Sequence, residues 1–215
     1  MTIKLVGSSS GSVSIAAPAT TSGGANRTLT LPDINSTIDT TGRAGNILQV
    51  VNTGVTSNSS LNLTSISTWY TISSLDTTIT TSSANSKILI NAQIYGEADT
   101  ADYVVCFKIV KVIGGTESDI TNGIGDAASN RSRINQVKNI GYYDNDQSST
   151  PSTNVFAGLL DSPSQSANTA ITYRLKVMID EGSSKVFYVN RPVTDGDEAS
   201  MERGISYMTL MEVAA

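Results

Sequence analysis

The sequence has no histidine and a single cysteine, Cys106. Because histidine is the usual general base near neutral pH and the commonest zinc ligand, its absence disfavours most hydrolytic mechanisms and most zinc sites. One cysteine cannot form a disulfide within the chain, so burial or association with other chains must hold the fold together. Cys106 lies in the mostly apolar segment 104–109, which predicts a buried strand residue.

Charge is also scarce. Charged residues make up 15% of the chain, against roughly 25% in ordinary soluble domains. Ser, Thr, Asn and Gly fill the difference, which is typical of strands and turns and disfavours long amphipathic helices. The net charge is −5 and the 14 basic residues are scattered. Since binding to a phosphate backbone needs clustered Lys and Arg, we expect no nucleic-acid partner.

Long apolar runs are missing as well. A membrane-spanning helix needs about 18 or more apolar residues in succession, and a secretory signal needs an apolar core near the N-terminus. Neither pattern occurs. We therefore expect a protein that is made in a cytoplasm and does not insert into a membrane.

The first part of the chain, residues 1–66, is dominated by Ser, Thr, Gly and Asn. It contains short strand-like pieces but no helical i, i+3, i+4 spacing of apolar residues. Each piece is too short to bury much apolar surface, so residues 1–66 are predicted to be an extended arm with small β-ribbons. The pieces are Ile3–Val6, Ser12–Ala16, Thr28–Leu31 and Asn46–Val51.

Longer segments of alternating polarity begin near residue 69 and continue to the C-terminus. Such alternation, with turn clusters between the segments, is typical of half-buried antiparallel strands. Residues 67–215 are therefore predicted to form an all-β, jelly-roll-like antiparallel β-sandwich, with a β-barrel as the alternative. The nine expected strands are Trp69–Ile72, Thr77–Thr80, Lys87–Tyr95, Tyr103–Ile113, Ser132–Tyr143, Asn154–Leu160, Ala170–Asp180, Lys185–Asn190 and Gly204–Val213.

Two of these strands show the expected inward faces most clearly. The apolar set of the first is Ile88, Ile90, Ala92 and Ile94, and that of the second is Tyr173, Leu175, Val177 and Ile179. The last strand, residues 205–213, differs because apolar residues occur on both of its faces. A strand of this kind is usually buried on both sides, which predicts either a central position in the sandwich or a subunit contact.

Acidic pairs in turns are the first candidates for chemistry. Asp144 with Asp146, and Asp195 with Asp197, could hold calcium or act as paired carboxylates. Neither pair has a full series of loop ligands, so a solvated turn is the preferred interpretation. A glycosidase site that uses one of these pairs, or Asp126 with a distant acid, would need a defined carboxylate separation in a cleft.

Two other patterns also have simple explanations. Residues Gly7–Gly11 match the Gly-x-Ser-x-Gly pattern of hydrolases, but no buried strand precedes them and no helix follows. Tyr142, Tyr143 and Tyr188 could stack on a sugar, although packing between strands is the more common use of such residues. We therefore predict no enzyme, and no catalytic, metal-binding or cofactor-binding residue.

Two sets of segments resemble a known group of proteins. Gly11–Thr20 (GSVSIAAPAT) and Arg27–Pro32 (RTLTLP) resemble a leader on virion structural proteins of cyanobacterial and other marine tailed bacteriophages. A second set extends the resemblance toward the C-terminus: Ser86–Ile90, Gly123–Ala127, Leu160–Pro163, Thr172–Lys176, Val189–Arg191 and Ser206–Ala214. The resemblance implies a virion component and assigns no receptor-binding residue.

The resemblance implies that the chain is a structural protein on the outside of a phage particle and that it is made in the host cytoplasm. Residues 1–66 would attach to other virion proteins, and the sandwich of a tail-fibre or appendage subunit would project outward, where it could contact a host glycan or protein. The alternative is a capsid decoration, or cement, protein whose arm adds strands to neighbouring shell subunits. Phage fibres and many decoration proteins are three-fold, so a homotrimer is expected.

Overall fold

The computed structural model describes residues 2–6, 12–16, 43–99, 105–138, 151–199 and 201–215. The chain forms two compact units, Met1–Asp39 and Thr40–Ala215. In the first unit, β1 (Thr2–Val6) pairs with β2 (Ser12–Ala16) as an antiparallel ribbon. The two strand-like pieces expected in this region are thus confirmed. The third piece, Thr28–Leu31, lies outside the described residues.

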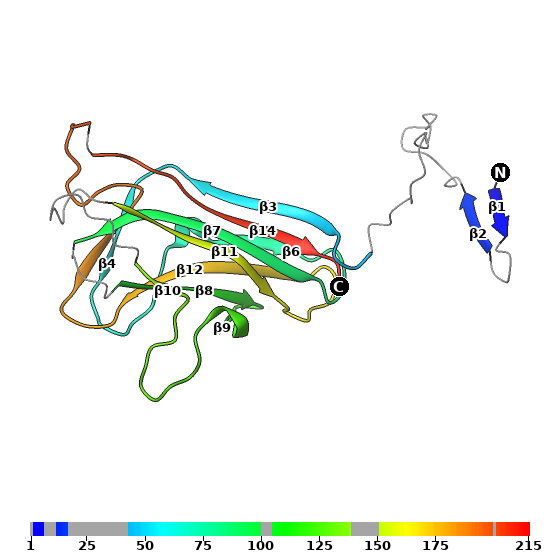
Figure 1. The fold of residues 1–215 in the computed structure, drawn as a ribbon, viewed down its shortest axis with the longest axis horizontal. Helices are drawn as coiled ribbons and strands as arrows, with labels where there is room; N and C mark the ends of the chain where they lie inside the picture. Colours follow the sequence, from blue (N-terminus) through cyan, green and yellow to red (C-terminus); the bar gives the residue numbers. More distant parts are fainter. Residues whose placement is uncertain (1, 7–11, 17–42, 100–104, 139–150, 200) are drawn as a thin grey trace. The chain divides into compact units, whose positions relative to one another are not determined.

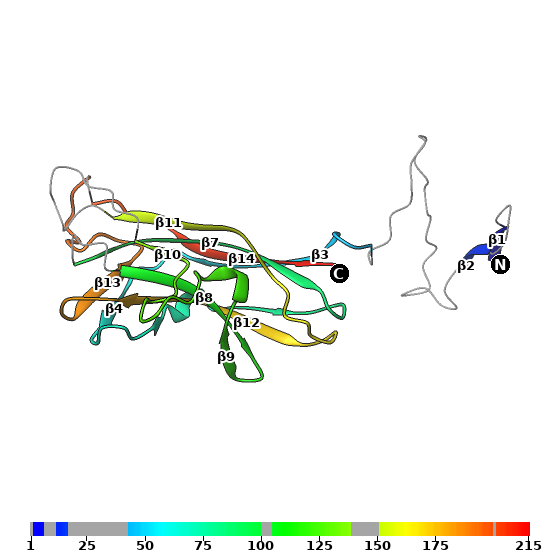
Figure 2. The same cartoon turned by 60° about the horizontal axis from the view of Figure 1, so that its bottom comes forward.

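The second unit is a sandwich of two antiparallel sheets, so the predicted fold class is confirmed. Figure 1 shows the strands running along its length, and Figure 2 shows β7 and β14 in one layer with β8 and β12 in the other. The β14 sheet has the order β3-β14-β7-β13-β4, and β11 also pairs with β7. Its strands are β3 (Ile47–Val55), β4 (Ser59–Leu63), β7 (Lys87–Ala98), β11 (Ser152–Asp161), β13 (Lys185–Val189) and β14 (Ser206–Val213).

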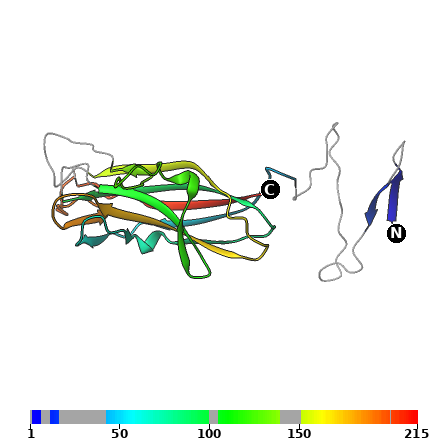
Figure 3. The same ribbon diagram turned by 90° about the horizontal axis from the view of Figure 1, so that it is seen from below.

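The second layer, the β8 sheet, has the order β10-β8-β12-β5, with β6 beside β12 and β9 beside β8. The β8–β9 turn projects beyond the sheets (Figure 2, Figure 3). In the described part of the chain, no helix has the length and hydropathy needed to cross a membrane. The strands and two short 3-10 helices of this layer are β5 (Tyr70–Thr71), η2 (Ser73–Leu75), β6 (Thr77–Thr80), β8 (Val105–Ile113), β9 (Thr116–Asp119), η3 (Thr121–Gly123), β10 (Gln136–Val137) and β12 (Ala170–Ile179).

The predicted boundary after residue 66 needs correction, because the sandwich already includes β3 and β4. β3 pairs with β14 along almost its whole length, and β4 pairs with β13. Val55 and Leu63 contribute buried side chains to the core. The Ser, Thr and Asn residues of this region led to its assignment to the arm. Those polar residues fit strands at the margin of a sheet, where one face is in water.

The core lies between the two sheets and confirms the predicted alternation. All eight residues of the two inward-facing sets named above are buried. Phe107 on β8 meets Phe187 on β13 and Phe156 on β11, with ring centroids 5.5 and 6.3 Å apart in edge-to-face geometry. Such pairs join the two sheets through their aromatic edges. The strand predicted over Ser132–Tyr143 is much shorter within the described residues, where only β10 is extended and paired.

One ion pair lies inside this apolar core. The Lys111 Nζ is 2.8 Å from the Asp161 Oδ1, and the Tyr173 hydroxyl donates to Asp161 Oδ2 at 2.8 Å. Burial, and then the adjacent carboxylate, raise the pKa of Tyr173. The phenol therefore stays protonated and acts as a donor to the carboxylate, which satisfies a charge that would otherwise be costly to bury.

Cys106 is buried on β8, as predicted from its neighbours. Burial raises the pKa of its thiol to about 12, with a further contribution from the Asp180 carboxylate. Its sulfur lies 3.7 Å from Asp180 Oδ2. The residue is therefore a packing residue of the sheet in its protonated form.

Candidate functional site at the loop end of the sandwich

The two ends of the sandwich differ in structure. They correspond to the two ends of β14, at Val213 and at Ser206. At the Val213 end, Gly45 N–H donates to Ala214 O at 3.0 Å and Ala214 N–H donates to Asn46 O at 2.8 Å. The chain therefore enters the sandwich beside its own C-terminus. At the other end, roughly 23 Å away by the rise of a strand, the segment 190–205 leads into Ser206. Figure 1 shows the C-terminus beside the start of β3 and this orange segment at the far end.

We name this far end, with residues 190–205 and the adjoining ends of β7, β10 and β13, the loop end. Asn190 begins the segment in a left-handed conformation, with φ at 61°, and has no exposed surface. Its Nδ2 donates to Val55 O at 2.7 Å and to Ser57 O at 2.9 Å. Ser206 Oγ donates to Asn190 Oδ1 at 2.6 Å and accepts from Tyr95 N–H at 3.0 Å. The two ends of the segment are thus held together by one buried hydrogen-bond network.

A buried acid fixes the segment near its start. Glu97 is almost fully buried, and its Oε2 accepts from Val193 N–H at 2.7 Å. Lys138 is buried nearby; burial lowers the pKa of its ammonium group, and the Glu97 carboxylate opposes this by favouring the charged form. These contacts tie β7 and the end of β10 to the segment 190–205.

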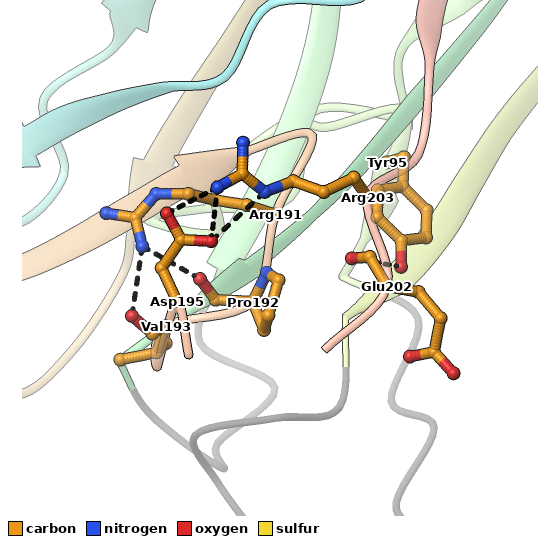
Figure 4. A network of polar contacts seen from close by, with 7 residues as sticks. All are labelled: Tyr95, Arg191, Pro192, Val193, Asp195, Glu202 and Arg203. Atoms are coloured by element: carbon orange, nitrogen blue, oxygen red, sulfur yellow. Dashed lines mark hydrogen bonds and ion pairs between the residues drawn. The ribbon is translucent and has the colours of Figure 1, made fainter. Parts of the chain in front are cut away.

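Two arginines organise the exposed part of the segment (Figure 4). Arg191 Nη1 donates to the carbonyls of Pro192 and Val193 at 3.1 and 3.0 Å. Its guanidinium carbon also lies 4.1 Å from the centroid of the Tyr188 ring. Arg203 Nη2 lies 2.7 Å from Asp195 Oδ1, and Nε donates to the same oxygen at 3.0 Å. Figure 4 shows both guanidinium groups and the Asp195 carboxylate gathered on one side of the segment.

Tyr95 supports the second half of the segment. Its hydroxyl donates to Glu202 O at 3.2 Å, and its ring lies against Gly204. A Cβ at Gly204 would lie 2.3 Å from Tyr95 Cδ1, so only glycine fits between the ring and β14. Exposed carboxylates project from this supported segment: Asp195, Asp197, Glu198 and Glu202. The arrangement is a positioned, polar, net acidic surface.

Among the acidic candidates, the structure describes Asp126, Asp195 and Asp197. Asp195 binds Arg203, whereas Asp197 and Asp126 are exposed. Among the described residues, no group of three or more Asp, Glu and Cys side chains could hold a metal ion. Asp144 and Asp146 lie outside the residues that the structure describes. The absence of catalytic, metal-binding and cofactor-binding residues stays a prediction.

Of the remaining candidates, the tyrosines and the Gly-x-Ser-x-Gly pattern, the structure describes only Tyr188. Tyr188 is half-buried, and the Arg191 guanidinium covers one of its faces, so that face cannot stack on a sugar in this conformation. Tyr142, Tyr143 and Gly7–Gly11 lie outside the described residues. Sequence reasoning did not identify Glu97, Lys138 or Asn190, although a charged residue within an apolar segment, such as Glu97, is a usable signal of a buried polar contact.

A concavity of about 490 Å³ lies beside β11, apart from the loop end. Its lining contains backbone, amide and apolar groups but no charged side chain. Gln136 Nε2 donates to Val155 O across one side of it, at 3.3 Å. The described residues that line this groove supply no titratable group for acid–base chemistry. The residues that form it are 122–125, 134–136 and 155–159.

Comparison with known proteins gives no sequence match and only weak structural similarity. No protein-family model matches the sequence, and no curated protein sequence matches it. A chain in the structure of the infectious bursal disease virus Gx strain is 12% identical, with a TM-score of 0.37, over 98% of this chain and 45% of that chain. The VP2 subviral particle of the same virus gives 12% identity and a TM-score of 0.37 over 95% and 45%. This chain thus spans less than half the length of those chains, and a likeness of this size assigns it to no family.

Proposed function

We propose that this chain is a structural protein on the exterior of a tailed-phage particle, a tail-fibre or appendage subunit. Its N-terminal segment docks to the virion, and its sandwich projects outward and contacts a glycan or protein of the host surface. The observation that carries the proposal is the separation of the two ends of the sandwich. The chain enters beside its own C-terminus, whereas the supported segment 190–205 leads into the opposite end of β14.

The physical character of the loop end supports the outward role. Buried contacts from Asn190, Glu97 and Ser206 hold its segment before any ligand arrives. A surface ordered in advance loses less conformational entropy on binding, which favours recognition. The resemblance of residues 11–20 and 27–32 to phage leaders supports the docking role of the N-terminal segment. We further propose that the working unit is a homotrimer.

Electron microscopy with gold-labelled antibodies against the protein tests the location. The proposal expects label on tail fibres or appendages of intact particles. Label on heads would instead favour a capsid decoration protein that stabilises the shell. Particles without label on their exterior would contradict both.

A competition experiment tests the role of the loop end. Purified protein should reduce adsorption of the phage to its host, and the double variant Asp195→Ala, Arg203→Ala should compete less well because the segment loses its bidentate ion pair. Asp126→Ala is the matched control, since Asp126 is also exposed but lies outside segment 190–205. Equal competition by all three proteins would show that the ion-paired segment is not the host contact.

A further inference from the structure

The outer faces of the two sheets differ in charge. On the β8 sheet, Lys108 pairs with Asp119 at 2.7 Å, Lys176 with Glu117 at 2.6 Å, and Arg174 with Asp76 at 2.9 Å. Lys108 Nζ also lies 4.7 Å from the centroid of the Trp69 ring. This face is therefore covered by paired charges, which suits contact with water.

The outer face of the β14 sheet has almost no charge. Because the buried residues alternate with outward ones along each strand, the outward set can be read from the pairing registers. Away from the loop end, Lys87 is its one charged member among the described residues; Glu97, further along the same alternation on β7, is buried against segment 190–205. We define the neutral face as these residues: Val50, Asn52 and Gly54 on β3, Tyr207, Thr209, Met211 and Val213 on β14, Lys87, Leu89, Asn91 and Gln93 on β7, and Val155 and Leu160 on β11.

An apolar row crosses the neutral face from one edge of the sheet to the other. Met211 pairs with Val50 on one side and with Leu89 on the other, and Leu89 pairs in turn with Leu160. Four paired strands span roughly 14 Å. Val50 is 56% exposed and Leu160 40%, while Met211 and Leu89 between them are half-buried. Single exposed apolar residues are common, but a continuous apolar row on an uncharged face indicates a contact surface.

We propose that the neutral face binds the neutral faces of further copies of this chain, and this inference rests on the homo-oligomer of the proposed function. The distribution of charge favours a second copy of the chain as the partner. With a net charge of −5, copies of the chain repel one another wherever acidic groups meet, and the neutral face carries none. A strongly charged partner would find only one charge to pair with on the neutral face, that of Lys87.

Shape and orientation favour the same occupant. Twisted sheets pack against one another through interdigitated side chains, and each copy supplies such a sheet. A rotation axis that runs along the strands would bring the neutral faces together. It would also keep the loop ends of all copies on one side and the points where the chains enter the sandwich on the other. The amides of Asn52, Asn91 and Gln93, beside the apolar row, can form hydrogen bonds across the contact.

Light scattering on the full-length protein at micromolar concentration tests the assignment. The wild type should have a mass well above the 22.5 kDa of one chain, and three times that mass for the proposed homotrimer. Val50→Glu and Met211→Glu should each weaken association by at least about tenfold, because they place unpaired charges in the contact. Val50→Glu changes an exposed side chain, so it remains informative if Met211→Glu does not fold. Val112→Glu is the matched control, because Val112 is also half-buried but lies on the outer face of the β8 sheet.

The outcomes separate this inference from the function on which it rests. Dissociation of both neutral-face variants, with Val112→Glu still associated, supports the proposal. An associated wild type whose mass survives Val50→Glu and Met211→Glu overturns the neutral face as the contact and leaves the oligomer standing. Dissociation of Val112→Glu as well would also overturn it. A monomeric wild type overturns both the surface and the oligomer, whereas the location on the particle is decided separately by microscopy.

Discussion

Asn190 is the residue on which the loop end depends most, because one buried side chain connects β3, the turn after it and β14. Asn190→Ala would leave the carbonyls of Val55 and Ser57 and the Ser206 hydroxyl without these partners. We expect a loss of about 2–4 kcal/mol in the free energy of unfolding, measured by urea denaturation. Asn62→Ala, at an exposed strand position, is the control and should change the value by less than about 0.5 kcal/mol. Equal effects of the two changes would contradict this role.

Glu212 makes the stability depend on pH. It has no exposed surface. Burial alone would raise the pKa of its carboxyl, but donors from Gln49, Ser82 and Ser83 outweigh burial and lower the pKa from 4.5 to about 2. Because the folded pKa lies below the unfolded one, this stabilisation is complete above about pH 4.5 and is lost as the pH falls toward 2. Its size is on the order of 3 kcal/mol.

Glu212→Gln isolates this contribution. The variant should be less stable than the wild type at pH 7, and the difference should shrink between pH 4.5 and 2 as the wild-type carboxylate takes up a proton. Thermal or urea unfolding at several pH values measures the difference. A stability difference that stays constant from pH 6 to pH 2.5 would show that the Glu212 charge does not stabilise the fold.

Among the elements, strands with a clear inward face could be predicted from the sequence, whereas the short, mostly exposed strands β4 and β9 could not. β7 and β12 alternate because each has one face in the core. β4 and β9 are short and mostly exposed, so their sequences, SSLNL and TESD, carry little apolar pattern. Pairing with a neighbouring strand, rather than burial, holds them in place, and pairing depends on residues far away in the sequence. Of the two positions predicted for the last strand, the central one is confirmed, since β14 lies between β3 and β7, and the subunit contact stays a prediction.

The role of β3 and β4 can be tested by two fragments. Residues 43–215 contain every strand of the sandwich, whereas residues 67–215 lack β3 and β4. We expect cooperative thermal unfolding only for the longer fragment. The shorter one loses the buried Val55 and Leu63, at about 1.5–3 kcal/mol each, and leaves backbone groups of β13 and β14 without partners. Circular dichroism follows both. Cooperative unfolding of residues 67–215 near the temperature of the longer fragment would refute this role.

For the whole molecule, the proposed docking and recognition roles belong to different parts of the chain. The described residues of the buried core cluster, from Val55 to Leu210, all belong to the second unit. Removal of residues 1–42 should therefore change the free energy of unfolding by less than about 1 kcal/mol. The same truncation should abolish incorporation into particles, as judged by protein analysis of purified virions. Normal incorporation of the truncated chain would contradict the docking role.

The candidate site at the loop end is assembled from residues that lie far apart in the sequence. Its contacts join residues near 55, 95, 138, 190 and 206, which only the finished sandwich brings together. Sequence reasoning placed residues 195–197 between two strands, which the structure confirms, but the pattern there gives no sign that Asp195 pairs with Arg203. Nothing in a local pattern reports a partner that another strand supplies. Likewise, the neutral face appears only when the registers of four strands are combined.

The buried Cys106 has a practical consequence. With its pKa near 12 and only 1% of its surface exposed, the thiol should resist alkylation at neutral pH as long as β8 stays paired with β10 and β12. It becomes reactive only when those strands separate. Because it is the one cysteine of the chain, its labelling rate at increasing reagent concentration measures how often that separation occurs. The natural protein thus contains a single-site chemical reporter of its own opening, usable in isolated subunits and in assembled particles without any engineered label.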